Sequence, residues 1–275
     1  MALSAAQQAL EKAGITGAQL DVIVDYTILP QDYLVPAWNM GNRLQHELGA
    51  SKAFTVGFSG GGSSNFLVSL ASAVALLQAN EKLQTALLVA ADLTLPGNRV
   101  LHPQEPLSLL GDAAGAMVLR RDATANVILD SELVSNGELH DVYYIPGGAL
   151  AHPDDAELYR LQLDKGRYDG AAKTTCLRQM TDRILKRVGI PLSAVAFALY
   201  PNLSRQDQAE FRQAFALKPE QMSVSTLSTH GHLQGTDFVV NYLAMLESGA
   251  VKPGDYFVAA SHGMGFLPAV ALFRA

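Results

Sequence analysis

The chain has 275 residues, of which 49% are apolar and 17% charged, and its formal net charge at pH 7 is −6. This length and apolar content supply a sizeable hydrophobic core and exclude a disordered chain. The acidic balance, without any cluster of Lys and Arg, lacks the basic surface that nucleic-acid binding requires. We therefore expect no nucleic-acid partner.

A single cysteine, Cys176, excludes a disulfide within the chain and any cysteine-rich metal site, which is typical of a cytoplasmic protein. The first residues lack the cationic flank and the cleavage site of a signal peptide. The longest apolar stretch, 66–77, is shorter than the roughly 20 residues that cross a bilayer. The sequence predicts a cytoplasmic location without membrane association.

The first half of the chain predicts helices that alternate with apolar strands. Helices are expected at 5–13, 40–48 and 65–77, and strands at 21–26, 53–58, 85–90 and 111–119. The helix at 5–13 is followed by Gly14-Ile15, where the glycine suits a left-handed cap.

The second half repeats this order about 170 to 175 positions later, with Gly189-Ile190 in the place of Gly14-Ile15. Helices are expected at 176–188, 207–215 and 238–246, and strands at 195–200, 222–227, 256–260 and 263–273. Apolar strands of this kind are covered on both faces, so two such units predict a duplicated α/β fold with five layers, α/β/α/β/α. We divide the chain into halves at 1–125 and 126–275, with 136–170 as the connecting segment.

Four passages resemble β-ketoacyl-acyl-carrier-protein synthase III, a family of the thiolase superfamily. They are 5–30, the Gly-Asp-Ala-Ala-Gly-Ala turn at 111–116, the helix entry at 166–172, and 249–255 with its continuation at 263–274. The resemblance implies the thiolase fold, acyltransferase chemistry in fatty-acid or polyketide biosynthesis, no cofactor, and a dimer. It also implies acyl-CoA or acyl-carrier protein as the substrate carrier. The family has a further strand before its first helix, which this sequence lacks. Either the sequence is truncated at this point, or an edge of the first half is covered by a partner.

The catalytic cysteine of the family lies at a turn between a strand and a helix, where it attacks an acyl thioester. Here the turn at 56–64 reads Val-Gly-Phe-Ser-Gly-Gly-Gly-Ser-Ser. A gapless alignment places Gly60 at the cysteine position, and Cys176 falls on a helix of the other half. We therefore expect no condensation through a thiolate.

Ser59 is the candidate nucleophile, because 57–61 reads Gly-Phe-Ser-Gly-Gly and fits the G-x-S-x-G elbow between a strand and a helix. A serine hydroxyl is hardly ionised near neutral pH and needs an adjacent base. The alternative is that Ser59, Ser63 and Ser64 only cap the start of the helix.

Two further family positions, a histidine and an asparagine, bind the thioester carbonyl in relatives. Asn202 stands at the histidine position and His232 at the asparagine position, with His230 two residues before it. Both side-chain types donate hydrogen bonds to a carbonyl oxygen, so an exchange preserves this role. As a base for Ser59 the sequence offers His232 or His230.

His262 precedes the closing loop Gly263-Met264-Gly265, whose backbone N–H points at the oxyanion in relatives. Together with Gly60, these residues are the predicted contacts of the substrate carbonyl. The histidines are not spaced as metal ligands on one helix face, so we expect no metal.

Two functions remain open. The first is a non-condensing partner subunit, either a homodimer or a heterodimer with a cysteine-bearing ketosynthase paralogue, because the cysteine, the usual histidine and the first strand are all missing. The second is a serine acyltransferase or thioesterase that acts on acyl-CoA or acyl-carrier protein through Ser59. The acyl chain, the carrier and the partner are not determined by the sequence.

Overall fold

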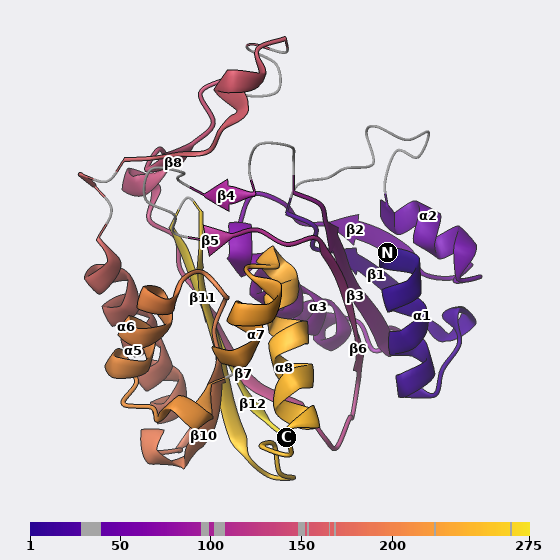
Figure 1. The fold of residues 1–275 in the computed structure, drawn as a ribbon. Coiled ribbons are helices and arrows are strands. Elements are labelled where there is room, and N and C mark those ends of the chain that lie inside the picture. Colours follow the sequence, from indigo (N-terminus) through magenta and orange to yellow (C-terminus); the bar gives the residue numbers. More distant parts are fainter. Residues whose placement is uncertain are drawn as a thin grey trace.

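The fold consists of two four-stranded sheets and three layers of helices (Figure 1). The computed structural model describes residues 1–28, 40–94, 99–101, 108–147, 152, 154–164, 166–167, 169–222, 224–264 and 266–275. The helices are α1 (Ala2–Ala13), α2 (Met40–Glu47), α3 (Asn65–Ala79), α5 (Gly170–Val188), α6 (Arg205–Ala214), α7 (Val224–His230) and α8 (Asp237–Glu247).

Each sheet combines parallel strands with one antiparallel strand, which is β6 in the first sheet and β12 in the second. The first has the order β2-β1-β3-β6, from β1 (Val22–Asp25), β2 (Phe54–Gly57), β3 (Thr85–Asp92) and β6 (Ala113–Arg120). The second has the order β10-β11-β12-β7, from β7 (Val127–Leu133), β10 (Val195–Leu199), β11 (Tyr256–Gly263) and β12 (Leu267–Arg274). Two short pairs, β4 (Val100–Leu101) with β5 (Ser108–Leu109) and β8 (Tyr143–Tyr144) with β9 (Gln162–Leu163), lie outside these sheets.

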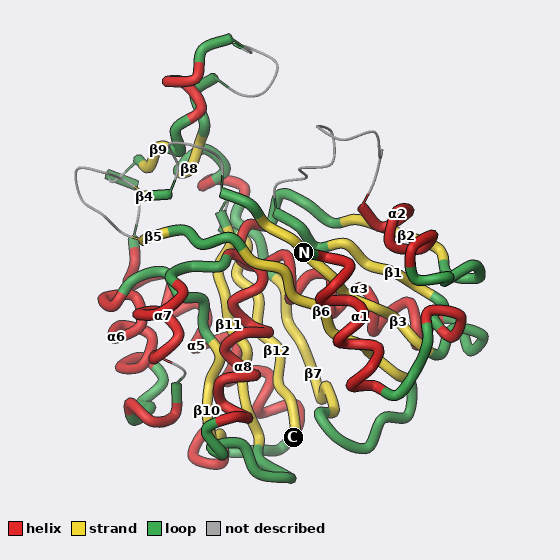
Figure 2. The backbone as a smooth tube through the Cα atoms, turned by 45° about the vertical axis from the view of Figure 1, so that its right-hand side comes forward, coloured by secondary structure: helices red, strands yellow, loops and turns green. Residues whose placement is uncertain are grey.

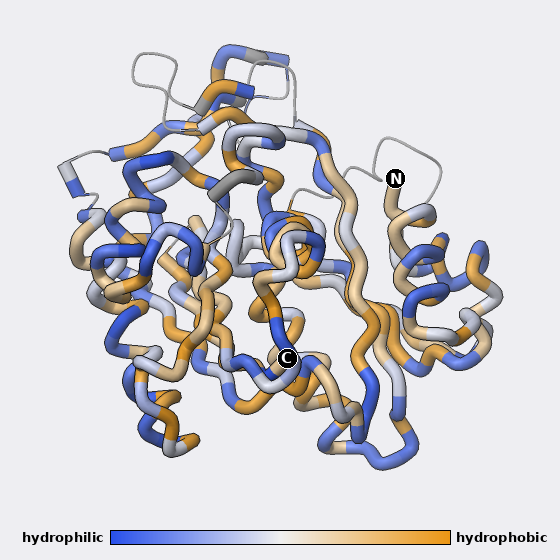
Figure 3. The backbone as a smooth tube through the Cα atoms, turned by 60° about the horizontal axis from the view of Figure 1, so that its bottom comes forward, coloured by the Kyte–Doolittle hydropathy of each residue, from blue (hydrophilic) through white to orange (hydrophobic). Residues whose placement is uncertain are grey.

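Three buried clusters define the predicted five layers. Alternating side chains of β3 face opposite ways: Leu87 packs with α1 and α2, whereas Leu88 packs with α3 and the second sheet. The third cluster joins the outer face of the second sheet to α5 and α6. Figure 2 shows α8 between the strands of the two sheets, and Figure 3 shows apolar segments concentrated in the strands. The α/β thiolase-type arrangement predicted from the sequence is confirmed.

The first helix of each half ends in the same way. Gly14 and Gly189 both end a helix in the left-handed conformation, with φ of 66° and 79°. One predicted strand, 222–227, is wrong: among the described residues Met222 forms only an isolated bridge with Ala198, and Val224–His230 form α7. The β-branched sequence favoured a strand, but the helix brings Thr226 into a buried hydrogen-bond network with Asn202 and Asn241.

The central helix α3 owes its apolar sequence to burial between the sheets. The stretch Gly62–Ala79 is long and apolar enough to cross a membrane by length and composition, and 56% of it is buried inside the protein. Such a core helix is weak evidence for a membrane span.

The middle layer is joined by the stacked rings of Phe66 in α3 and Phe238 in α8, whose centroids lie 5.1 Å apart. Both rings are buried. We expect Phe238→Ala to lower the free energy of unfolding by about 3–5 kcal/mol through lost burial and a cavity. Urea unfolding measures this loss, with Tyr144→Ala at a 48% exposed position as the control. Equal small losses in both variants would contradict the central role of this contact.

Candidate functional site

The turn between β2 and α3 is held by one side chain, Asn65. Its Oδ1 accepts a hydrogen bond from the backbone N of Gly61 at 2.8 Å, and its Nδ2 donates to the carbonyl oxygen of Phe58 at 3.1 Å. A short 3₁₀ turn, Gly62–Ser64, then leads into α3. The backbone N–H groups of this first turn give the site a partial positive charge.

The closing loop packs against this turn backbone to backbone. A Cβ on Gly263 would lie 1.6 Å from the carbonyl oxygen of Gly61, and a Cβ on Gly62 would lie 2.6 Å from the backbone N of Met264. Gly62 also has a φ of 52°, which favours glycine. The structure therefore brings Gly263 and Met264, two predicted contacts of the substrate carbonyl, to the turn between β2 and α3. The predicted Gly265 lies outside the described residues.

Three side chains from separate segments form a hydrogen-bonded chain at this point. The Oγ of Ser63 lies 3.2 Å from Nε2 of His232, and Nδ1 of His232 lies 2.6 Å from Oδ2 of Asp237. Ser63 belongs to the turn before α3, His232 follows α7, and Asp237 is the first residue of α8. Their exposed fractions are 5%, 3% and 0%.

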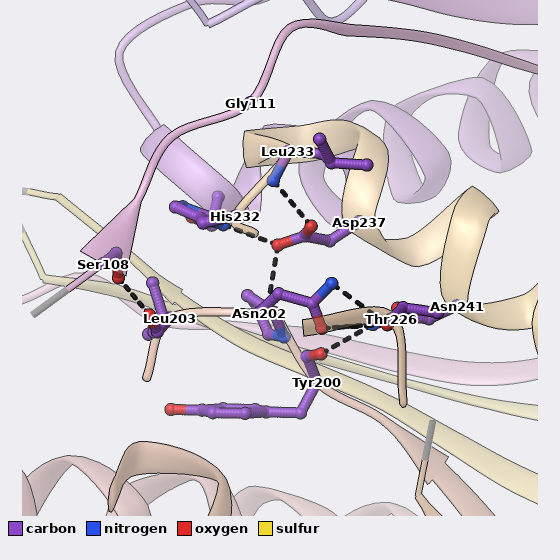
Figure 4. A network of polar contacts seen from close by, with 12 residues as sticks. Ser108, Gly111, Tyr200, Asn202, Leu203, Thr226, His232, Leu233, Asp237 and Asn241 are labelled. Carbon is purple, nitrogen blue, oxygen red and sulfur yellow. Dashed lines mark hydrogen bonds and ion pairs between the residues drawn. The ribbon is translucent and has the colours of Figure 1, made fainter. Parts of the chain in front are cut away.

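The carboxylate of Asp237 is fixed by two backbone donors as well as by the histidine (Figure 4). Its Oδ1 accepts from the N–H of Leu233 and its Oδ2 from the N–H of Asn202, each at 2.8 Å. Because a carboxylate only accepts, we assign the proton of the His232 ring to Nδ1. The lone pair on Nε2 then faces the hydroxyl of Ser63, which is the arrangement of a general base beside its nucleophile.

Asn202 contacts Asp237 through its backbone N–H, but its side chain is turned into the protein. It is fully buried, its Nδ2 donates to Thr226 Oγ1 at 3.1 Å, and its Oδ1 accepts from Asn241 Nδ2 at 3.2 Å. The amide predicted to bind the substrate carbonyl is thus engaged inside the fold. Its backbone N–H instead positions Asp237.

The predicted pairing of Ser59 with a histidine is corrected by this geometry. Ser59 is exposed and its hydroxyl bonds to no described residue, while His230 is exposed and pairs with Thr229 Oγ1 at 2.8 Å. Gly60 is also exposed. The elbow motif pointed to Ser59, whereas the serine hydroxyl that reaches His232 is that of Ser63, four residues later in the turn.

The neighbouring Ser64 has a structural contact: its Oγ donates to the carbonyl oxygen of Leu267 at 2.6 Å, which ties the start of α3 to β12.

Asp237 was missed by sequence reasoning. The available signal was an acidic residue at the start of a predicted helix, five positions after His232.

His262 is buried beside Tyr200, with ring centroids 6.4 Å apart. Its Nε2 has no hydrogen-bond partner among the described residues. The pKa of His262 lies well below 6.5, because burial disfavours the charged ring and the charges of Lys173 and His232 act in the same direction. Within the described ranges, no group of three His, Cys, Asp or Glu could hold a metal ion.

This lowered pKa makes stability depend on pH. Below about pH 6.5 the unfolded chain binds a proton at His262 that the folded protein does not, so the free energy of unfolding falls as the pH drops. We expect a loss of up to about 1.4 kcal/mol per pH unit from this residue. Urea unfolding at pH 7.5 and 5.5 should show a smaller loss in His262→Leu than in the wild type or in exposed His46→Leu. Equal losses in all three would contradict the assignment.

Comparisons with known proteins agree with this architecture. A family model for 3-oxoacyl-[acyl-carrier-protein] synthase III matches residues 60–137. The chain is 28% identical over 282 residues to β-ketoacyl-[acyl-carrier-protein] synthase III of Erythrobacter litoralis, covering 100% of the chain and 83% of the relative. It is 27% identical over 284 residues to an acetoacetyl CoA synthase of Streptomyces sp. strain CL190, with the same two coverages.

The structure is also similar to the crystal structure of 3-oxoacyl-[acyl-carrier-protein] synthase III from Aquifex aeolicus, with a TM-score of 0.81 at 20% identity. This match covers 100% of the chain and 83% of that protein. It extends over both sheets and all three helical layers.

Proposed function

We propose that this chain, a β-ketoacyl synthase III-like protein with the thiolase fold, is an acyltransferase that carries the acyl group on Ser63. The observation that supports this most strongly is the chain of hydrogen bonds from Ser63 through His232 to Asp237. A serine, a base and an orienting carboxylate in this order are the parts of a serine acyl-transfer site.

In the first step the Oγ of Ser63 attacks the carbonyl carbon of an acyl thioester, and Nε2 of His232 takes the hydroxyl proton. The C–S bond then breaks, and the leaving thiolate receives this proton from His232 as a free thiol. The acyl group remains as an ester on Ser63. An acceptor alcohol, amine or water gives a proton to His232 and attacks the ester, and the proton returns to Ser63 Oγ when the C–O bond breaks.

Two backbone groups are suited to stabilise the oxyanion of these steps. The N of Met264 lies next to Gly62, and it donates no hydrogen bond to a described residue. The N–H of Ser63 stands in the first turn before α3, where backbone donors are left without helical acceptors. Donors that the fold fixes in place before the reaction need no rearrangement when charge develops.

Acyl-CoA or acyl-carrier protein is the proposed donor. The relatives are named for an acyl-carrier protein and for acetoacetyl CoA, which supports a thioester substrate. Cys176, the only cysteine, lies in α5 of the other half, so no thiol is available at the turn for condensation.

The direct test is the intact mass of the protein after incubation with a panel of acyl-CoAs. We expect a mass increase of one acyl group in the wild type and in the matched control Ser59→Ala. Ser63→Ala should show none, because the ester cannot form. An adduct that persists in Ser63→Ala, or the absence of any adduct and any acyl transfer across the panel, would contradict the proposal.

Asp237→Asn tests the orienting carboxylate. The amide can donate to the ring, which reverses the tautomer of His232 and points an N–H at Ser63. We expect the acylation rate to fall on the order of 10³–10⁴-fold. Stopped-flow or quenched-flow acylation kinetics measure this loss, with exposed Asp182→Asn in α5 as the control. Similar rates in the two variants would show that Asp237 does not orient the base.

A non-condensing partner subunit is the second candidate, and one observation favours it. β2 forms one end of the first sheet, and its Phe54 is 43% exposed, so an apolar strand is available for pairing with another ketosynthase. In this case the chain would raise the condensation rate of a cysteine-bearing paralogue. The increase would be equal with wild type and Ser63→Ala, whereas the acyltransferase proposal predicts no such stimulation.

A further inference from the structure

A short segment of the first half, 108–112, joins β5 to β6 and passes beside His232 of the second half (Figure 4). The N–H of His232 donates to the carbonyl oxygen of Leu109 at 2.8 Å, and the N–H of Gly111 donates to the carbonyl oxygen of His232 at 3.0 Å. Both backbone polar groups of His232 are therefore bonded to the first half. We call 108–112 the clamp segment.

Two glycines let the clamp segment approach this closely. A Cβ on Gly231 would lie 2.4 Å from the carbonyl oxygen of Leu109, and the φ of 70° at Gly231 also favours glycine. A Cβ on Gly111 would lie 2.7 Å from the carbonyl oxygen of His230. The backbone contact with His232 thus depends on the absence of a side chain on both sides.

An ion pair holds the clamp segment from outside. The Nη2 of Arg99 lies 2.6 Å from Oδ2 of Asp112, and its Nη1 donates to the carbonyl oxygen of Leu110 at 3.3 Å. The N–H of Thr94 donates to Oδ1 of Asp112 at 2.8 Å. The hydrogen bond from Arg99 is the main cause of the lowered pKa of Asp112, so this carboxylate is ionised at neutral pH. Arg99 therefore bonds to both residues that flank Gly111.

The position of His232 relative to Ser63 depends on contacts between the halves. Ser63 belongs to the first half and His232 to the second, and their side chains lie 3.2 Å apart. Asp237 orients the ring of His232, but it also belongs to the second half and cannot fix this separation. The clamp segment belongs to the first half, as Ser63 does, and so fixes the backbone of the base relative to the nucleophile. A misplacement of about 1 Å between reacting groups lowers a rate on the order of 100-fold.

We propose that Arg99 is a positioning residue of the acyl-transfer site: it holds the clamp segment, and the clamp segment holds His232 within reach of Ser63. This role rests on the acyl transfer proposed for Ser63. Arg99 acts from the surface, because its side chain is 56% exposed and its hydrogen bonds with described residues are made to the clamp segment. An exposed ion pair contributes little to overall stability, so the protein should fold without it.

Arg99→Met tests this role through two readouts. Hydrogen exchange at the amide of His232 should become on the order of tenfold faster, because its bond to Leu109 opens more often. The limiting rate at which an uncharged fluorophosphonate labels Ser63 should fall about tenfold or more, with the half-saturating probe concentration unchanged. An uncharged probe excludes a direct effect of Arg99 on an anionic carrier.

Two further variants separate positioning from a general effect. Arg99→Lys keeps a cation beside Asp112 and should recover part of both losses. Arg160→Met removes an ion pair with Glu157, in which the arginine side chain is 50% exposed, and should change neither readout.

Unchanged exchange at His232 in Arg99→Met would overturn the clamp. Unchanged labelling despite faster exchange would overturn its role in positioning, and equal losses in Arg160→Met would show that the effect is not specific to Arg99. A wild type in which Ser63 is never labelled would contradict the proposed acyl transfer instead. Exchange at His232 would then still decide whether Arg99 holds the clamp segment.

Discussion

The site depends on one buried carboxylate, that of Asp237. It accepts hydrogen bonds from the His232 ring and from the backbone N–H groups of Leu233 and Asn202. These contacts join the start of α8 to the segments that follow α7 and β10. A buried carboxylate that lost these donors would be strongly destabilising, so the three segments are held together as a unit. The same contacts direct His232 towards Ser63, so stability and the proposed acyl transfer depend on one set of hydrogen bonds.

Much of the fold follows from local sequence features. The repeated Gly-Ile pairs after α1 and α5 and the apolar strands predicted a duplicated α/β arrangement, because periodicity and helix caps act within a few residues. The segment 222–227 shows the limit of such reasoning. Its strand propensity is outweighed by the buried contacts of Thr226 with Asn202 and Asn241.

The site was predicted less completely, since its geometry depends on contacts between distant segments. His232 could be found from the family pattern, whereas Ser63 was recognised only as a cap and Asp237 was missed. The path of the nucleophile turn is fixed by Asn65 and by the close approach of Gly263 to Gly61, and neither constraint is visible in a motif. A count along the sequence cannot show which serine faces the histidine when the turn contains three consecutive glycines.

The central claim is that His232 activates Ser63, and covalent labelling tests it most directly. The protein would be treated with a fluorophosphonate, which reacts with activated serines, and the modified residue located by tandem mass spectrometry. The account predicts phosphonylation of Ser63, greatly slowed in His232→Ala. A label on Ser59 or Ser64, no label on Ser63, or labelling of Ser63 at an unchanged rate in His232→Ala would contradict it.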